Sequence, residues 1–277
     1  MKIEQIIDEA FKEDIGDGDH TSDACIAEST KGKAQLLVKE KGIVAGVELA
    51  QRIFSRFDNS LKVQVFIKDG TPVKEGDIVF TIEGSSRSIL KTERIVLNFM
   101  QRMSGIATKT AQMNKLLEGT QAKLLDTRKT TPLLREIEKW AVAIGGGVNH
   151  RFGLYDMIMI KDNHIDMAGG IENAISNVKS HLATIGKSLK IEVEVRSFEE
   201  LNEVLRIGGI NRIMLDNFSP KDEKKAVAII AGRFETEASG GITEDTIRDH
   251  ALAGVDYISV GALTHNIKSI DLSLKAI

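Results

Sequence analysis

The second half of the chain has a regular pattern of apolar and polar positions. Short apolar runs alternate with amphipathic patterns of helical period from residue 122 onward. The apolar runs lie at 122–125, 157–160, 191–195, 212–215, 236–238 and 257–260. The helical patterns lie at 131–143, 171–181, 198–207, 220–231 and 243–253. Such alternation predicts βα units built around a parallel sheet.

The number of predicted strands limits the kind of parallel sheet that can form. A complete α/β barrel has eight strands and takes ~250 residues, which is more than residues 122–277 provide. We therefore expect an incomplete, open α/β barrel, with a doubly wound open sheet as the alternative. The first strand is not followed by a glycine fingerprint of the dinucleotide-binding type, which weighs against the alternative.

The first part of the chain follows no repeating order of strands and helices. A first helix has its apolar residues on one face, at Ile3, Ile6, Ile7, Ala10 and Phe11. Strands are expected at 33–38, 43–45, 63–67 and 77–82, and a long helix at 88–118 with a break at Gly105. These elements predict an N-terminal α/β sandwich domain with a connecting helix over 1–105, followed by the open barrel domain over 106–277.

Charge and composition exclude several classes of function. The formal net charge of −3 argues against a nucleic-acid-binding protein, which usually has a strongly basic domain. No apolar run approaches the ~18 residues that a membrane-spanning helix needs. Cys25 is the only cysteine, so no intrachain disulfide can form, which suits a reducing compartment. The first residues are typical of an acidic amphipathic helix rather than a signal peptide, and we expect a cytoplasmic protein.

Residues able to carry out chemistry accompany each of the six apolar runs. They are Asp126 to Lys129, Lys161 to His164, Glu192 and Glu194, Asp216 and Asn217, Ser239 to Gly241, and Val260 to Ala262. In an α/β barrel, the residues just past the carboxyl ends of the strands face the active site. Glu192 and Glu194 share one face of their strand, because strand side chains alternate. The sequence therefore predicts one site at this end of the sheet.

Basic residues gather in the stretch from Asp126 to Asp166. They include Arg128, Lys129, Arg151 and Lys161, with His150 between the glycines at 145–147 and Arg151. Lys and Arg number six in this stretch and so do Asp and Glu, which favours a selective pocket for a small polyanion over a general basic patch. Arginine binds a carboxylate through two parallel hydrogen bonds, and histidine can add a third donor. The charged residues of the predicted helix between them are expected to be solvated: Glu136, Glu138 and Lys139.

The acidic residues and glycine loops indicate a second half of the same site. Glycines such as those of Ser239 to Gly241, ahead of a helix, let backbone N–H groups approach an anion. Phosphate sites after the last two strands recur in barrel enzymes, although a structural turn would also explain this loop. Glu194 and Asp216 beside a phosphate imply Mg²⁺, held mainly through substrate oxygens and water. Alternatively, these two carboxylates form salt bridges with Lys161 and Arg128.

Strings spread along nearly the whole chain resemble the quinolinate phosphoribosyltransferase family. They are Glu13 to Thr21, Glu93 and Arg94 through Asn98, Ser104 to Thr108, Asp126 to Thr130, Gly145 to Arg151, Ile160 to His164, Leu215 to Asn217, Ala238 to Gly241 and Ser259 to Ala262. The resemblance implies an N-terminal sandwich and an open α/β barrel, paired head to tail in a homodimer. It also implies quinolinate and 5-phosphoribosyl-1-pyrophosphate as substrates, a requirement for Mg²⁺, and nicotinate mononucleotide, pyrophosphate and CO₂ as products.

The resemblance also implies roles for individual residues. Arg128, His150, Arg151 and Lys161 look like the quinolinate pocket, and Arg94 looks like a residue donated by the partner subunit. The residues that look like the family's phosphoribosyl side are Lys129, Glu194, Asp216, Ser239, Gly240, Gly241, Val260, Gly261 and Ala262. Thr127 is a further substrate-binding candidate. Lys129, Glu194 and Asp216 are the expected catalytic residues, and Glu194 and Asp216 the expected Mg²⁺ ligands.

Two other functions are compatible with parts of the sequence. One is a relative of the same fold that acts on another aromatic carboxylate such as nicotinate, or a molybdenum-transport-associated relative. The set of Arg128, His150, Arg151 and Lys161 favours a substrate with two carboxylates over one. The other is a non-catalytic carrier or anion-binding module built on the hairpin at 68–77, but a carrier displays a lysine at its hairpin tip in a motif of its own, and none is obvious there.

Overall fold

A computed structural model describes residues 2–277 of the protein, which form two compact units. Unit 1 contains the chain up to Ala111 together with Thr130–Gly146 and Leu263–Ile277. Unit 2 contains Gln112–Lys129 and Gly147–Ala262. Within residues 2–277, no helix combines the length and the apolar character needed to cross a membrane.

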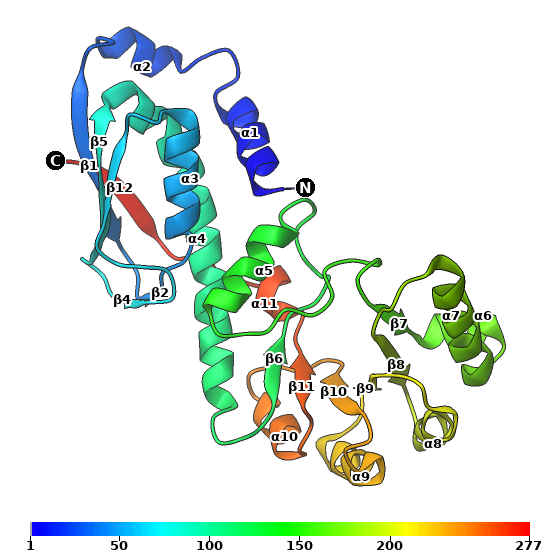
Figure 1. Ribbon diagram of the computed structural model, residues 1–277. Helices are drawn as coiled ribbons and strands as arrows, with labels where there is room; N and C mark the ends of the chain where they lie inside the picture. The colour runs from blue at the N-terminus through cyan, green and yellow to red at the C-terminus, as the bar shows by residue number, and fades with distance from the viewer. Residues whose placement is uncertain (1) are drawn as a thin grey trace. The chain divides into compact units, whose positions relative to one another are not determined.

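Unit 1 is built on an antiparallel sheet (Figure 1). Its elements are α1 (Ile3–Asp14), α2 (His20–Cys25), β1 (Lys31–Val38), β2 (Gly42–Ile43), α3 (Val47–Phe57), β3 (Lys62–Val65), β4 (Pro72–Val73), β5 (Ile78–Ser85), α4 (Ser86–Leu116), which continues into unit 2, α5 (Arg135–Ile144) and β12 (Leu272–Ala276). The main sheet has the strand order β12-β1-β5-β3, and β2 and β4 form a separate pair. The expected strands of the N-terminal part are present, although β2 and β3 are shorter than predicted.

The core of unit 1 is apolar. Leu36 and Val38 of β1 and Phe80 of β5 are completely buried. Helix α3 contributes Phe54, whose ring meets that of Phe80 edge to face at a centroid distance of 5.9 Å. Alternation along the strands explains this burial, because every second side chain of β1 faces the core.

The C-terminal strand and the long helix of unit 1 differ from the sequence prediction. The C-terminal strand β12, which was not predicted, pairs with β1 and places Leu272 opposite Val38, so the sheet contains strands from both ends of the chain. Helix α4 runs unbroken through Gly105. A Cβ atom at Gly105 would lie 2.3 Å from the backbone oxygen of Lys268, so glycine there permits a close approach of two segments instead of breaking the helix.

Charged residues of α5 that were expected in solvent are buried instead. Glu138 and Lys139 are almost inaccessible. The Glu138 carboxylate accepts hydrogen bonds from Arg102 Nε (2.8 Å) and from the Thr131 N–H (3.1 Å). The prediction was wrong because a guanidinium from α4, distant in sequence, supplies the partner that a buried carboxylate needs.

Unit 2 is a parallel sheet with helices (Figure 1). Its elements are β6 (Lys123–Leu125), β7 (Ile158–Ile160), α6 (Asp162–Ala168), α7 (Ile171–Ile185), β8 (Ile191–Val195), α8 (Phe198–Ile207), β9 (Arg212–Asp216), α9 (Pro220–Ile230), β10 (Glu235–Ser239), α10 (Ile247–Leu252) and β11 (Tyr257–Ser259), followed by α11 (Ala262–His265) at the unit boundary. The strand order is β6-β11-β10-β9-β8-β7. In the described chain β6 and β7 do not pair, so the sheet is a barrel left open between its first two strands. The predicted α/β class, with an open parallel sheet, is confirmed.

The segment after the glycines at 145–147 lies along β6 and not along β7. Val148 forms a parallel bridge with Leu125, and its N–H donates to the Leu124 oxygen at 2.8 Å. The Asp126 N–H in turn donates to the Val148 oxygen at 3.2 Å. These bonds bring His150 and Arg151 to the carboxyl end of β6, where the site residues were predicted.

Candidate active site

Charged side chains occupy one face of the six-stranded sheet. The strand register pairs Glu192 of β8 with Arg212 of β9, and Arg212 with Glu235 of β10. Residues two or four positions further along a strand share this face, because strand side chains alternate. Glu194, Asp216 and Glu237 therefore lie on the same side of the sheet as Glu192 and Arg212. The opposite face carries apolar residues: Val193, Val195, Ile213 and Leu215 are fully buried.

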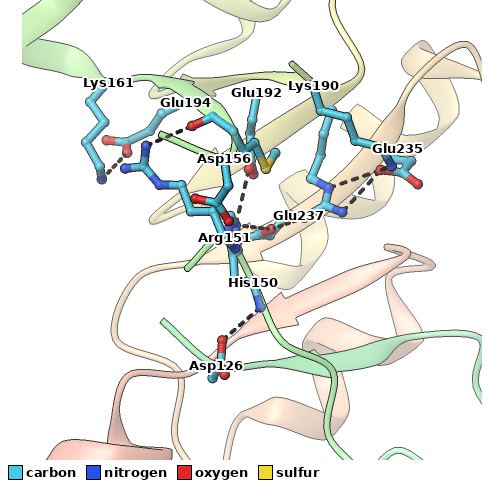
Figure 2. A network of polar contacts seen from close by, with 12 residues as sticks. Asp126, His150, Arg151, Asp156, Lys161, Lys190, Glu192, Glu194, Glu235 and Glu237 are labelled. Atoms are coloured by element: carbon cyan, nitrogen blue, oxygen red, sulfur yellow. Dashed lines mark hydrogen bonds and ion pairs between the residues drawn. The ribbon is translucent and has the colours of Figure 1, made fainter. Parts of the chain in front are cut away.

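Lys161 and Glu194 form an ion pair near the carboxyl ends of β7 and β8 (Figure 2). Lys161 Nζ lies 2.9 Å from Glu194 Oε2, and the Glu194 side chain is buried while that of Lys161 is partly exposed. Asp216 follows on β9, where burial and the charge of Glu194 raise the pKa of its carboxyl group above the usual range. The salt-bridge alternative foreseen for Glu194 is thus present with Lys161.

The charge of Arg128 affects the ionisation of Arg151. Burial and the charge of Arg128 lower the pKa of Arg151, whose side chain is half-buried. Arg151 Nη1 donates to the backbone oxygen of Met157 at 3.3 Å. Arg151 also lines a cavity of about 320 Å³ together with Ile160 and His164, so its side chain reaches the end of β7. The structure therefore brings Arg151 close to Arg128 and to the strand from which Lys161 follows.

His150 is buried, and protein groups lie close to both of its ring nitrogens (Figure 2). Nε2 lies 3.2 Å from Glu192 Oε2 and 3.2 Å from Glu237 Oε2. Nδ1 accepts the backbone N–H of Arg151 at 2.6 Å. Burial alone lowers the pKa of His150, but the two carboxylates outweigh it and raise the pKa to about 9. The ring is thus held by protein groups, whereas the sequence interpretation gave it a hydrogen bond to the ligand.

Glu192, Arg212 and Glu237 form a layer around the His150 ring, and the sequence reasoning assigned only Glu192 of these three to the predicted site. Arg212 Nη1 donates to Glu237 Oε2 at 2.9 Å, and the guanidinium lies 4.0 Å from the ring centre of Tyr257. The signal in the sequence was the placement of charged residues at alternate positions in the strand segments IEVEV and ETEAS. Buried charged side chains such as these must find partners across the strands.

The loops after β9 and β10 pack tightly against each other. Gly240 has φ of +101°, and a Cβ atom there would lie 2.2 Å from Asn217 Oδ1. The Asn217 N–H donates to the Ser239 oxygen at 2.8 Å, and Asn217 Nδ2 donates to Asp216 Oδ2 at 2.6 Å. Glycine at 240 is thus required by the packing. Helix α10 begins only at Ile247, so the loop of Ser239 to Gly241 does not lead directly into a helix as predicted.

The remaining predicted residues lie in loops and on α4. Lys129 and Arg128 are exposed, and the Lys129 N–H donates to Thr127 Oγ1 at 3.0 Å. At the end of β11, the N–H of the buried Val260 donates to the Leu125 oxygen at 3.0 Å, and Gly261 and Ala262 are partly exposed. Arg94 is exposed on α4 in unit 1. His164 follows the same strand as Lys161. Its Nδ1 accepts the Lys161 N–H at 2.9 Å and caps the start of α6.

Comparison with known proteins identifies one family over nearly the whole chain. Residues 19–104 match the family model described as "Quinolinate phosphoribosyl transferase, N-terminal domain", and residues 106–275 match its C-terminal counterpart. A relative from Oryza sativa, named nicotinate-nucleotide pyrophosphorylase (carboxylating), chloroplastic, is 48% identical over 99% of this chain and 77% of its own length. A probable nicotinate-nucleotide pyrophosphorylase (carboxylating) from Bacillus subtilis is 40% identical over 99% of this chain and 93% of its own.

A solved structure shows the same fold over the same length. The crystal structure of NadC from Streptococcus pyogenes superimposes with a TM-score of 0.93 at 41% sequence identity, and the match covers 99% of this chain and 97% of that one. The agreement extends over both units of the chain.

Proposed function

The chain belongs to the quinolinate phosphoribosyltransferase family, and we propose that the carboxyl end of its six-stranded sheet is where it carries out the family's reaction. The protein is a decarboxylating phosphoribosyltransferase that acts on quinolinate and produces nicotinate mononucleotide for NAD biosynthesis. The phosphoribosyl donor is 5-phosphoribosyl-1-pyrophosphate, and the other products are pyrophosphate and CO₂.

The observation that carries this placement is the grouping of positive charge around Arg151. Arg128 is near enough to lower the pKa of Arg151, and Arg151 shares a cavity with the end of β7, which Lys161 follows. Quinolinate is a dicarboxylate, so it needs several fixed cations in a partly desolvated site, where attraction is stronger than in water. Arg128, Arg151 and Lys161 supply these cations, and His150, which is hydrogen-bonded to Arg151 through its ring, is assigned to the same pocket.

The phosphoribosyl donor occupies the neighbouring part of the strand ends. Lys129 follows Arg128 after β6, and Glu194 and Asp216 lie on β8 and β9, which are neighbours in the sheet. We assign the phosphates to the ends of β10 and β11 and the residues that follow them: Ser239, Gly240, Gly241, Val260, Gly261 and Ala262. Thr127 lies on the loop after β6. The positive φ angles of Gly240 and Gly241 support this placement, because such turns direct backbone N–H groups toward an anion.

The chemistry proceeds without a covalent enzyme intermediate. The ring nitrogen of quinolinate attacks the anomeric carbon while pyrophosphate departs, and positive charge develops at an oxocarbenium-like centre. Glu194 and Asp216 stabilise this charge, and Lys129 stabilises the negative charge of the leaving pyrophosphate. Ribosylation makes the ring nitrogen cationic, so it stabilises the carbanion left when the adjacent carboxylate departs as CO₂. A proton then replaces the carboxylate.

Mg²⁺ fits the acidic side of the site. Glu194 and Asp216 offer carboxylate oxygens, the donors that Mg²⁺ prefers, and burial together with the charge of Glu194 raises the pKa of Asp216. Glu194 and Asp216 would hold the ion, and its charge would offset the negative charge of these two carboxylates. When bound, Mg²⁺ supplies neutralisation of charge on the departing pyrophosphate.

Arg94 is assigned to the active site of a second copy of the chain in a homodimer. It is exposed on α4, as a residue that reaches into a neighbour must be. Mixing inactive Arg94→Ala and Lys161→Ala dimers should restore one competent site per hybrid dimer. The absence of any recovered activity after subunit exchange would contradict the shared site. The single cysteine supports a reducing compartment, and we place the protein in the cytoplasm.

Product analysis tests the function directly. The pure protein is incubated with 5-phosphoribosyl-1-pyrophosphate, Mg²⁺ and, in turn, quinolinate, nicotinate or nicotinamide. We expect CO₂ and pyrophosphate in equal amounts with quinolinate and neither product with the other two. Consumption of nicotinate in place of quinolinate would overturn the assignment.

A further inference from the structure

A layer of buried ions lies beneath the proposed quinolinate pocket and has no role in the reaction described above. We call Glu192, Arg212 and Glu237 the buried ion layer. Glu192 and Glu237 are 0% exposed and Arg212 is 7% exposed. Removing charges from water costs free energy, and apolar side chains of similar size often replace buried ion pairs without loss of stability. The layer therefore calls for a functional explanation.

A metal site is one explanation that the charges argue against. One nitrogen of His150 and one oxygen each of Glu192 and Glu237 lie within 4.8 Å of one another, a spacing that would suit a metal ion. However, Arg212 already places a positive charge 2.9 Å from Glu237 Oε2, and His150 Nε2 lies 3.2 Å from both carboxylates. These two groups occupy the positions from which a metal ion would neutralise the acids.

The layer instead fixes His150 at the point where the chain enters the pocket. The His150 N–H donates to Asp126 Oδ1 at 2.8 Å, Nε2 lies between the two carboxylates, and Nδ1 accepts the Arg151 N–H. Both the ring and the backbone of His150 are thus held, and the position of Arg151 is set by the residue before it.

Arg151 needs such support because it lies close to a like charge. Burial and the charge of Arg128 disfavour its charged form, whereas the charge of Glu192 acts in the opposite direction. Two guanidinium groups that repel each other separate unless the backbone that carries them is rigid or nearby anions compensate. Glu192 of the buried ion layer contributes the compensating charge. Glu192 and Glu237 hold the ring of His150, and Asp126 holds its backbone N–H.

We propose that Glu192 and Glu237 are positioning residues for quinolinate: they hold the ring of His150, and through it they hold Arg151 in the geometry that receives a carboxylate. This proposal rests on the assignment of Arg151 to the quinolinate pocket. The positioning role requires a proton on Nε2 of His150, which points toward the two carboxylates. This role does not depend on whether Nδ1 also carries a proton. Arg212 belongs to the same unit because it keeps Glu237 ionised and in place.

Steady-state kinetics of Glu192→Gln and Glu237→Gln test the proposal. The matched control is Glu223→Gln, because Glu223 is also 0% exposed and its Oε1 lies 2.8 Å from a buried histidine, His250, between α9 and α10 of the same unit. Quinolinate and 5-phosphoribosyl-1-pyrophosphate are varied separately, and the melting temperature of each variant is recorded.

We expect both test variants to raise the KM for quinolinate about tenfold, with the KM for the phosphoribosyl donor changed less than about twofold. Glu223→Gln should lower the melting temperature and leave both KM values unchanged. Equal rises in the two KM values, or a lower melting temperature alone, would overturn the proposal.

A double variant identifies the route by which Glu237 acts. If it acts through His150, adding Glu237→Gln to His150→Asn should not raise the quinolinate KM further, because coupled residues show non-additive effects. Fully additive effects would mean that Glu237 reaches the substrate by another route. If Glu237→Gln fails to fold, Glu237→Asp replaces it, because the shorter side chain keeps the charge that Arg212 requires but draws back from His150.

The same series separates this proposal from the assignment on which it rests. If Arg151→Ala raises the quinolinate KM while Glu192→Gln and Glu237→Gln do not, only the positioning role fails. If Arg151→Ala leaves the quinolinate KM unchanged, the assignment of the pocket itself fails.

Discussion

The two sheets of this protein bury opposite kinds of side chain. In unit 1, β1 and β5 bury Leu36, Val38 and Phe80. In unit 2, the corresponding interior face of the sheet carries Glu192 and Glu237. Full burial of a large apolar side chain contributes ~1.5–3 kcal/mol, whereas a buried ion pair often contributes no more than the apolar residues it replaces. The first sheet is therefore built for stability, and the second gives up some stability to hold charges in fixed positions.

The other face of the sheet in unit 2 is apolar and contributes the stability that the charged face lacks. Val193, Val195, Ile213 and Leu215 are completely buried and point away from the charged face. Helices α7 to α10 cover one side of this sheet (Figure 1). Alternation along a strand thus lets a single strand such as β8 supply both core residues and ionic residues. Stability and chemistry are separated by face, and the comparison between the two sheets predicts which substitutions affect which property.

The largest expected effect is on stability, from the sheet of unit 1. Phe80→Ala should reduce the free energy of unfolding by ~3–5 kcal/mol, because it leaves a cavity beside Phe54. Urea titration measures this loss, and the folded variant should keep the KM values of the parent. Phe66→Ala is the control, since Phe66 is 53% exposed and should cost less than about 0.5 kcal/mol. A changed quinolinate KM in Phe80→Ala would show that the two sheets are not functionally distinct.

The second effect is on catalysis, from the charged side of unit 2. Arg151→Ala should lower kcat/KM for quinolinate by ~2–4 kcal/mol in activation free energy, which is roughly 30- to 1000-fold, because a charged contact in a partly desolvated site is lost. Its unfolding free energy should change little, since Arg151 is only half-buried. Arg206→Ala removes an exposed arginine paired with Glu172 and serves as the control. Kinetics identical to those of the parent would exclude Arg151 from the pocket.

The sequence predicted the strands of unit 2 because each is a short apolar run next to a helical pattern. All six strands, from β6 to β11, are found within two residues of the predicted ranges. The same reasoning missed β12, because the alternation in Leu-Ser-Leu is too short to stand out and its partner β1 lies more than 200 residues away. The division of domains at residue 105 stays a prediction, since both chain ends contribute to the sheet of unit 1.

The sequence could predict only those parts of the site that lie at the carboxyl ends of the strands. Lys161 with Glu194, and Arg128 with Arg151, could be grouped because parallel strands bring their carboxyl ends together. The partners of Glu138 and Glu237 could not be found in this way. Each depends on a side chain from a distant segment, and local periodicity cannot predict which cation arrives there. Buried charges at alternate strand positions reveal that a partner exists, but not its identity.

A third, intermediate effect is expected in the loop that meets the phosphates. Gly240→Ala should cost about 1–3 kcal/mol and raise the KM for 5-phosphoribosyl-1-pyrophosphate, since its Cβ would meet Asn217 at 2.2 Å in a left-handed conformation. Gly232→Ala is the matched control: φ is +71° there, but no atom lies within 4 Å of the added Cβ. Both variants carry the backbone strain, so the difference between them measures the packing of the loop. Equal KM values in the two variants would contradict a role for this loop in donor binding.

The smallest expected effect is the pH dependence of the buried ion layer. The contacts with Glu192 and Glu237 overcome burial and raise the pKa of His150 from 6.5 to about 9. A pKa raised in the folded state stabilises the protein fully below pH 6.5, and this contribution is lost as the pH rises toward 9. Burial raises the pKa of Glu192 to about 7, so the range from pH 7.5 to 9 reports mainly on His150.

The measurement is the difference in unfolding free energy between the parent and His150→Asn across that range. We expect the difference to shrink by on the order of 1 kcal/mol as the pH rises. The decrease is limited because a proton on Nδ1 has to displace the hydrogen bond from the Arg151 N–H. A constant difference would mean that the ring is neutral throughout, with Nδ1 accepting that N–H. In that case His150 and the buried ion layer would act on quinolinate through geometry alone, and the positive charge of the pocket would come entirely from its arginines and lysine.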